Sequence, residues 1–258
     1  MRLFILITFF SMLLQADGET IYKNKCASCH KAFIPMGQLK ENFVEYNNTK
    51  LQLKGPTLNQ LSFRLKQNIG DPKGDEEIHI MEVVAFIQDY LIDPDKQKSV
   101  CMDEVLDAFD TMPSLKGQIS EDESEEVAEY IYHFDKKSLE ENSPEYTEFD
   151  EAKKRAQKEK KLIMVKATSE HCFYCKKMDR EVFSEKEVLD VLSKNFVSVE
   201  VDVYKKKLPA GLEYKVTPTY IFLDENAKEL KKVPGAFDKS DFLEILAEVQ
   251  KLKKGDKK

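Results

Sequence analysis

The spacing of apolar residues changes near the middle of the 258-residue chain. In the first half, apolar residues recur every three or four positions, as on one face of an α-helix, and no segment alternates as a strand does. Helices are expected at Gly18–Cys26, Glu77–Ile92, Ser99–Phe109 and Ser124–Phe134. Leu51–Ser62 is instead rich in turn residues. The first half therefore predicts an all-α domain.

The second half of the chain contains segments with the helical spacing of apolar residues and segments with the alternation typical of strands. A short apolar run predicts a buried strand at Leu162–Val165, and alternating valines predict another at Val197–Val203. Tyr220–Leu223 and Leu230–Val233 are expected to pair as a hairpin. Helices are expected at Phe149–Lys160, from the Cys172-Phe173-Tyr174-Cys175 segment through Met178, at Glu185–Asn195 and at Phe237–Leu252. This alternation predicts an α/β domain.

Charge divides the chain at the same place. Residues 17–137 contain 14 basic and 23 acidic residues, whereas residues 138–258 contain 25 and 24, so the net charges are -9 and +1. This asymmetry indicates two independent units, with an exposed linker at residues 138–148 around Asn142-Ser143-Pro144 and a second domain at 149–258. The total charge of -7 argues against a nucleic-acid-binding protein.

The first 16 residues have the pattern of a secretory signal peptide. A basic start, Met1-Arg2, precedes the apolar run Leu3–Leu14, and Ala16 is a small residue before polar sequence. The alternative is a retained membrane anchor, but the run is shorter than the ~20 residues that span a bilayer. We therefore expect a soluble periplasmic protein with no stable membrane insertion.

Five cysteines are present, and four of them form two CxxC pairs. The first pair lies in Cys26-Ala27-Ser28-Cys29-His30, the attachment pattern of c-type haem, in which two thiols bond the porphyrin and His30 supplies a nitrogen to iron. The alternatives are a disulfide or half of a zinc site, although Cys101 and His79 lack the spacing of further zinc ligands. One such pattern predicts one covalent haem and a one-electron carrier.

Three segments, GETIYKNKCASCH, LKGPTLNQL and TMPSLKG, followed by the helix SEEVAEYIYHF, resemble the single-haem class I cytochromes c. The resemblance covers residues 18–134 and implies that His30 and Met112 bind iron from opposite sides. It also implies that the carbonyl of Pro56 accepts a hydrogen bond from the His30 ring. His/Met ligation raises the reduction potential and leaves no iron position open for catalysis. Met36, Met81 and Met102 are the alternatives to Met112, and each is expected to be a core side chain. His79 and His133 are expected to be structural.

The second pair, Cys172-Phe173-Tyr174-Cys175, lies between an expected strand and an expected helix. A helix N-terminus stabilises a thiolate through its free N–H groups. Cys172 is therefore expected to attack the substrate, and Cys175, one turn further, to resolve the mixed disulfide. The alternative is a static structural disulfide. The odd thiol, Cys101, is expected to be a small buried residue, with an intermolecular or sulfur-carrying thiol as the alternative.

The CFYC segment, together with VTPTYIFLDENAKEL further along, resembles the thioredoxin superfamily, and most of all the SoxW-like periplasmic thioredoxins of sulfur-oxidation operons. The resemblance covers residues 149–253 and implies a central mixed sheet with flanking helices. It also implies a cis proline at Pro218 that packs against the CxxC segment and exposes backbone for a substrate chain. Lys166 stands where many thioredoxins have a buried acid, and His171 where many have tryptophan. These differences leave the proton path of the second thiol open.

The two halves together predict an exported fusion of a cytochrome c domain, residues 17–137, with a thioredoxin-like dithiol domain. In one hypothesis the dithiol exchanges electrons with the haem, downhill in potential, although a dithiol gives two electrons and a haem accepts one. In a second, the cytochrome is a separate carrier and the dithiol reduces sulfur-carrier proteins or apocytochrome cysteines. In a third, the protein is a non-enzymatic haem sensor. The expected partners are cytochromes and other thiol, disulfide or sulfur-carrier proteins.

Overall fold

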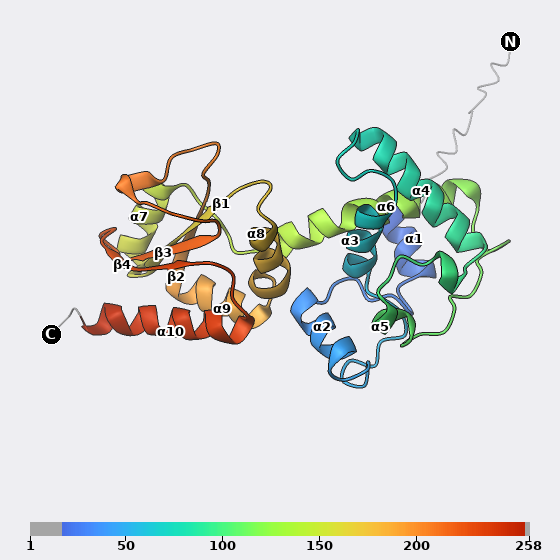
Figure 1. Cartoon of the computed structure of the whole chain (residues 1–258), viewed down its shortest axis with the longest axis horizontal. Coiled ribbons are helices and arrows are strands. Elements are labelled where there is room, and N and C mark those ends of the chain that lie inside the picture. Colours follow the sequence, from blue (N-terminus) through green and yellow to red (C-terminus); the bar gives the residue numbers. More distant parts are fainter. Residues whose placement is uncertain (1–16, 256–258) are drawn as a thin grey trace, which may run out of the picture.

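The computed structural model describes residues 17–255, which form a helical unit followed by a unit with a central sheet (Figure 1). The expected signal peptide, residues 1–16, lies outside the described residues. Between residues 17 and 255, no helix has both the length and the hydrophobicity that crossing a bilayer requires.

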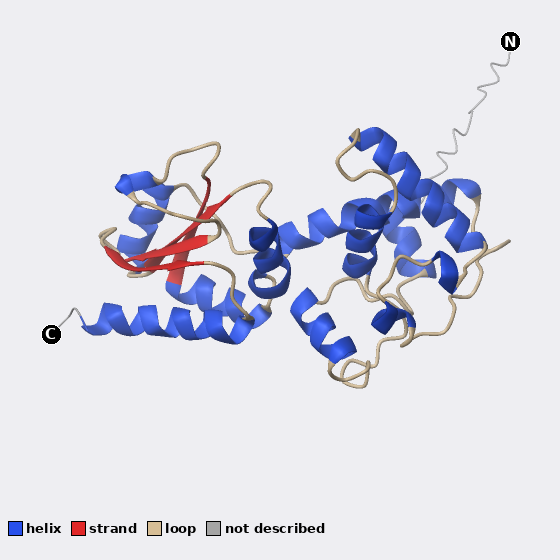
Figure 2. Ribbon diagram, in the orientation of Figure 1, coloured by secondary structure: helices blue, strands red, loops and turns tan. Residues whose placement is uncertain are grey.

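Helices and loops alone build the first unit (Figure 2), as the sequence predicts. The long helix α6 packs against α1, α3 and α4 around a core that includes Ile21, Val83 and Val127. Ser120 and Glu123 form a reciprocal capping box at the start of α6, which fixes where this helix begins. The elements are α1 Gly18–Lys25, α2 Met36–Val44, α3 Leu58–Asn68, α4 Glu76–Ile92, the 3₁₀ helix η1 Lys96–Lys98, α5 Asp103–Leu106 and α6 Glu121–Glu141.

Several helices of this unit differ from the expectation, among them α2, which the sequence analysis did not predict. The helix expected at Ser99–Phe109 is wrong over most of its length, because only α5 is helical there. The ammonium of Lys96 donates to the carbonyl of Leu106, which lies at the end of α5 and is thereby satisfied without a further helical turn. Conversely, α3 begins at Leu58, inside the segment expected to be turn-rich.

The expected linker, residues 138–148, is only partly a linker. Helix α6 continues through its first four residues and ends at Glu141. Ser138 is buried, and its hydroxyl donates to the carbonyl of Asp135, which extends the packed part of the helix. Further on, Tyr146 pairs with Ser198 in a parallel bridge, and the N–H of Thr147 donates to the Ser198 carbonyl. The segment between the two units is therefore held by helix α6 at its start and by the bridge to Ser198 near its end.

The second unit has a four-stranded mixed sheet with flanking helices, which confirms the predicted architecture. The strand order is β2-β1-β3-β4, with β1 parallel to β2 and antiparallel to β3. Its elements are α7 Phe149–Glu159, β1 Leu162–Thr168, α8 Phe173–Met178, the π-helix η2 Asp179–Phe183, α9 Lys186–Asn195, β2 Phe196–Asp202, the 3₁₀ helix η3 Pro209–Gly211, β3 Thr219–Leu223, β4 Glu229–Pro234 and α10 Lys239–Gly255.

Alternating side chains of β1 pack into two separate hydrophobic clusters, one on each face of the sheet. Leu162 and Met164 pack with residues of η2, α9 and α10 on one face of the sheet. Ile163 and Val165 pack with alanines of α7 on the other face. Because successive strand residues point to opposite faces, this parity also assigns Lys166 to the face covered by α8 and η2.

The two units meet where η2 lies against α2 and where Arg180 of η2 reaches α3 and α6. The guanidinium of Arg180 donates to Asp135 of α6 at 2.8 Å and lies 4.4 Å from the ring centre of Phe63 on α3. The amide of Gln38 donates to the carboxylate of Glu185 at 2.8 Å. A Cβ at Gly37 would lie 2.7 Å from the carbonyl oxygen of Glu181, so only glycine allows this approach.

We expect Arg180→Leu to lower the free energy of unfolding by about 2 kcal/mol, because Asp135 would keep only the more distant Lys66 as a buried counter-charge. Urea unfolding at pH 7 measures this. The control is Lys186→Gln, which removes an ion pair of two exposed side chains and is expected to leave the unfolding curve unchanged. Equal curves for Arg180→Leu and the parent would contradict the importance of this contact.

Candidate functional site

The sheet-containing unit presents a disulfide between Cys172 and Cys175 at the start of α8. Strand β1 ends at Thr168, and the N–H of Cys172 donates to the carbonyl of Ser169 in the short loop that leads into the helix. The Sγ of Cys172, at the N-cap position, accepts from the N–H of Cys175 at 3.1 Å. Cys172 is half-buried whereas Cys175 is 1% exposed, so only Cys172 is open to a client sulfur.

The peptide bond between Thr217 and Pro218 is cis, as the sequence predicts. Thr219, the first residue of β3, pairs with Ala167 near the carboxyl end of β1. The proline segment therefore lies at the same end of the sheet as the loop that leads to Cys172. The carbonyl of Pro218 accepts a hydrogen bond from the N–H of Gly235, which ties this segment to the end of β4.

Lys166 is 1% exposed and lies between two carboxylates. Its ammonium is 2.5 Å from Asp179 and 2.7 Å from Glu200. Burial by itself lowers the pKa of Lys166, but the surrounding acidic groups outweigh it and raise the pKa above its ordinary value. Burial raises the pKa of Asp179 above its ordinary value, and Lys166 acts against that rise. Lys166 is therefore charged, and its partners are Asp179 and Glu200, both of which the sequence analysis overlooked.

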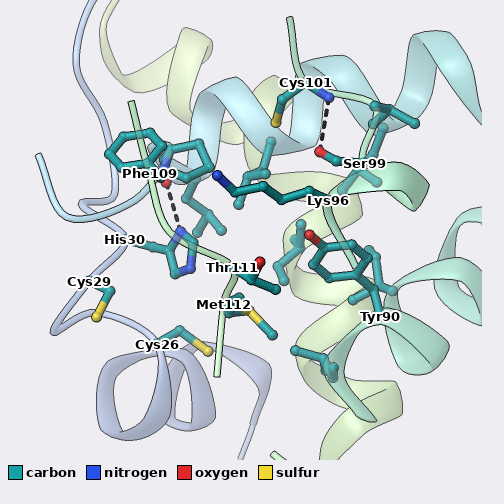
Figure 3. Close-up of a pocket in the computed structure, with 18 of the residues that line it drawn as sticks. Cys26, Cys29, His30, Tyr90, Lys96, Ser99, Cys101, Phe109, Thr111 and Met112 are labelled. Carbon is teal, nitrogen blue, oxygen red and sulfur yellow. Dashed lines mark hydrogen bonds between the residues drawn. The ribbon is translucent and has the colours of Figure 1, made fainter. Parts of the chain in front are cut away.

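The helical unit contains a second candidate site, a cavity lined by Cys26, Cys29, His30, Pro56 and Met112 (Figure 3). These residues come from the end of α1, from the turn before α3 and from the loop before α6, and the fold brings all five to one place. Cys26 is half-buried, whereas Cys29 is exposed at the rim. The sequence-predicted residues are thus neighbours in space across almost ninety positions of the chain.

The imidazole of His30 is held by one defined contact. Its Nδ1 lies 2.8 Å from the carbonyl oxygen of Pro56, so the ring donates from Nδ1 and keeps Nε2 free as an acceptor. Burial lowers the pKa of His30 below its ordinary value, which favours the neutral, metal-binding form of the ring. A Cβ at Gly55 would lie 3.0 Å from Cε1 of His30, so glycine leaves the ring its space.

The walls of the cavity are mostly apolar. Helix α3 contributes Leu58, Leu61 and Leu65, and α4 contributes Phe86 and Leu91. The polar groups at the cavity include the hydroxyl groups of Tyr90, Ser99 and Thr111 and the ammonium of Lys96. A mostly apolar cavity with a few convergent polar groups is typical of a ligand-binding site.

Neither alternative for the first cysteine pair is present in the structure. Cys26 and Cys29 are free thiols rather than a disulfide. Within residues 17–255, no group of three His, Cys, Asp or Glu side chains is arranged to hold a metal ion, as a zinc site would be. His79 is buried between the hydroxyl of Tyr132 and the carbonyl of Ile69, which fits the expected structural role.

Cys101 lines the same cavity, which the sequence analysis did not foresee. Its N–H donates to the hydroxyl of Ser99 at 3.2 Å, and burial raises the pKa of its thiol above the ordinary value. The thiol is therefore protonated at neutral pH, as a small partly buried side chain would be.

Comparisons with known proteins bear on the second unit. Residues 149–250 match the model of the thioredoxin-like domain family. An uncharacterized protein of Aquifex aeolicus (strain VF5) is 31% identical over 125 residues, which are 48% of this chain and 77% of that protein. Residues 149–250 therefore form a thioredoxin-like domain.

Solved structures also match part of this chain. A thioredoxin from Thermus thermophilus is 32% identical and covers 42% of this chain and 87% of its own, with a TM-score of 0.37. A putative disulphide-isomerase from Bacteroides thetaiotaomicron is 24% identical and covers 42% and 93%, with a TM-score of 0.36. The DsbH oxidoreductase is 19% identical and covers 43% and 86%, with a TM-score of 0.37.

After reduction of the disulfide, we expect a brief pulse of iodoacetamide at pH 7 to alkylate Cys172 at least about ten times faster than Cys175, because Cys175 is buried. Peptide mass spectrometry measures both. The same pulse in urea is the control and is expected to remove the difference. Equal alkylation of the two residues in the folded chain would contradict the assignment of Cys172 as the attacking thiol.

Proposed function

We propose that this protein is an exported thiol–disulfide oxidoreductase that also carries one covalent haem c. The observation that carries the proposal is the presence of two sites in one chain: the Cys172–Cys175 pair at the start of α8 and a histidine-and-thioether cavity beside the first CxxC pair. The thioredoxin-like fold supports the thiol chemistry, and the donor atoms around the cavity support the haem.

The dithiol works by exchange. The thiolate of Cys172 attacks one sulfur of a client disulfide, and the client's other sulfur leaves as a thiolate. The sulfur of Cys175 then attacks Cys172, which forms the intramolecular disulfide and releases the reduced client. The exposed side chains of Phe173 and Tyr174, 71% and 58% exposed, lie beside Cys172 and offer an apolar surface to the client chain.

The residues of the cavity fit a haem. Cys26 and Cys29 would hold it by thioether bonds, and His30 and Met112 would bind its iron. A haem with this ligation supplies reversible one-electron transfer at a raised potential. The protein's own contribution is to orient the His30 ring through Pro56, to keep it neutral by burial and to exclude water with the leucines of α3.

We further propose that the protein acts in the periplasm, in sulfur or thiol redox metabolism, with other redox proteins as partners. The signal-like sequence of residues 1–16 supports export. The charge of -9 over residues 17–137 supports a cytochrome surface that meets basic patches on its partners.

Expression in a bacterium with cytochrome c maturation enzymes tests the haem. We expect the parent chain to keep haem through denaturation and acid extraction, and Cys26→Ser/Cys29→Ser to lose it, because thioethers are covalent. Mass spectrometry and the absorbance of the denatured protein measure this. Cys172→Ser/Cys175→Ser is the matched control and should retain haem. A parent chain without covalent haem would overturn this half of the proposal.

The buried contact of Arg180 with Asp135 favours joint action of the two sites over two independent activities, because it fixes one unit on the other. After anaerobic addition of a catalytic thioredoxin-type reductant to the ferric protein, we expect the ferrous absorbance band to grow. It should grow only when Cys172 and Cys175 are intact, with Cys101 replaced in all chains. Equal growth in Cys172→Ser/Cys175→Ser would show that the cytochrome is a separate carrier.

A further inference from the structure

A buried cluster of charged groups lies beneath the dithiol helix. Lys166 of β1 is its centre, with Asp179 of η2 on one side and Glu200 of β2 on the other, where β1 and β2 place Lys166 and Glu200 directly opposite one another. The ring of Phe183 lies 5.1 Å from the ammonium. A buried ammonium with two carboxylates is costly to assemble unless its members are well paired.

Asp179 lies one helical turn beyond Cys175. The N–H of Asp179 donates to the carbonyl of Cys175, so at this point the spacing is that of an α-helix although η2 begins here. Side chains four positions apart lie on the same face of a helix, about 5–6 Å apart at Cβ. Helical side chains also lean toward the N-terminus, so the carboxylate of Asp179 leans toward the turn that carries Cys175.

Cys175 is buried, whereas the side chain of Asp179 is partly exposed to solvent. Cys175 is 1% exposed and has no direct access to water as a proton acceptor. The side chain of Asp179 is 31% exposed, while its Oδ1 contacts Lys166. The carboxylate of Asp179 therefore contacts both the buried side of the helix and solvent.

From these observations we propose that Asp179 is the proton acceptor for the Cys175 thiol, and that Lys166 is a positioning residue that keeps Asp179 ionised. The proposal rests on the thiol–disulfide exchange proposed above. Cys175 Sγ–H gives its proton to the Asp179 carboxylate as its sulfur attacks Sγ of Cys172. The Cys172–Cys175 bond forms and the bond from Cys172 to the client breaks. The client sulfur leaves with the electron pair and takes a proton from water, so the client is reduced and the dithiol oxidised.

The other charged groups near Asp179 decide its protonation. Lys166 and Arg180 favour the carboxylate, while burial and Glu200 favour the acid, and the net effect is a pKa above the ordinary value. A carboxylate with a raised pKa accepts a thiol proton more readily than an ordinary one. The phenols of Tyr146 and Tyr220 also lie near this cluster, and burial raises the pKa of both, so both are neutral.

The resolving step can be observed alone. The reduced full-length chain, with Cys101→Ser, is mixed with excess 4,4′-dithiodipyridine, and the released thiopyridone is followed by stopped-flow absorbance. Cys172 releases the first thiopyridone, and attack by Cys175 releases the second. The resolving phase is identified as the one that Cys175→Ser abolishes.

We expect Asp179→Asn to slow the resolving phase by about tenfold or more at pH 6–7 and to leave the first phase unchanged within about twofold. The difference should shrink above about pH 9, where a thiol ionises unaided. Asp179→Glu should restore part of the rate. Lys166→Met should move the rise of the resolving phase to higher pH, because without the ammonium Asp179 stays protonated to a higher pH.

The matched control is Glu181→Gln, which removes a carboxylate two residues further along, paired only loosely with Lys177 at 3.8 Å. It should change neither phase. If Asp179→Asn folds, as far-UV circular dichroism shows, and resolves at the parent rate across this pH range, the proposal is overturned while the exchange activity stands. A parent chain with no resolving phase would instead overturn the proposed function.

Discussion

The contact on which the arrangement of this protein depends is the ion pair of Arg180 with Asp135. Both side chains are largely buried, at 17% and 7% exposed, and Arg180 also lies on the ring of Phe63. Arg180 follows Asp179 directly, so the helix that carries the dithiol at one end is fastened to the helical unit at the other. Separating the two units would leave a buried charge without its partner, which costs free energy. This contact therefore holds the two units in a fixed arrangement.

Helix α3 shows how closely the two sites are connected. Its leucines at positions 58, 61 and 65 line the cavity, whereas Phe63 meets Arg180 and Lys66 meets Asp135 on another side of the same helix. The hydroxyl of Ser62 donates to the carbonyl of Tyr132 and accepts from the N–H of Asp135, which locks α3 to α6. One helix thus forms the wall of the cavity and the support of the dithiol unit.

The sequence predicted the parts of this protein that depend on local pattern. The valines of β2 and the apolar run of β1 have strand periodicity, and both became strands of the predicted mixed sheet. The helix expected at Ser99–Phe109 was wrong over most of its length because Val100 and Phe109 face the cavity from loops on either side of α5, a position that helical spacing alone does not distinguish from a helix face. The contact between the units depends on Asp135 and Arg180, which are 45 positions apart in the chain. A local sequence pattern does not predict such a pair.

The position of Lys166 beneath the dithiol helix follows from the alternation of side chains along β1. Leu162, Met164 and position 166 share the face that α8 and η2 cover, so any residue at 166 lies under the dithiol helix. A lysine there requires anions from the elements within reach. Strand β3 offers only Tyr220 at the paired position, β2 offers Glu200, and the helix offers Asp179. The lysine at this strand position is therefore paired with Asp179, an acid one turn beyond Cys175, and this pairing places a carboxylate on the turn next to the thiol whose proton we propose it accepts.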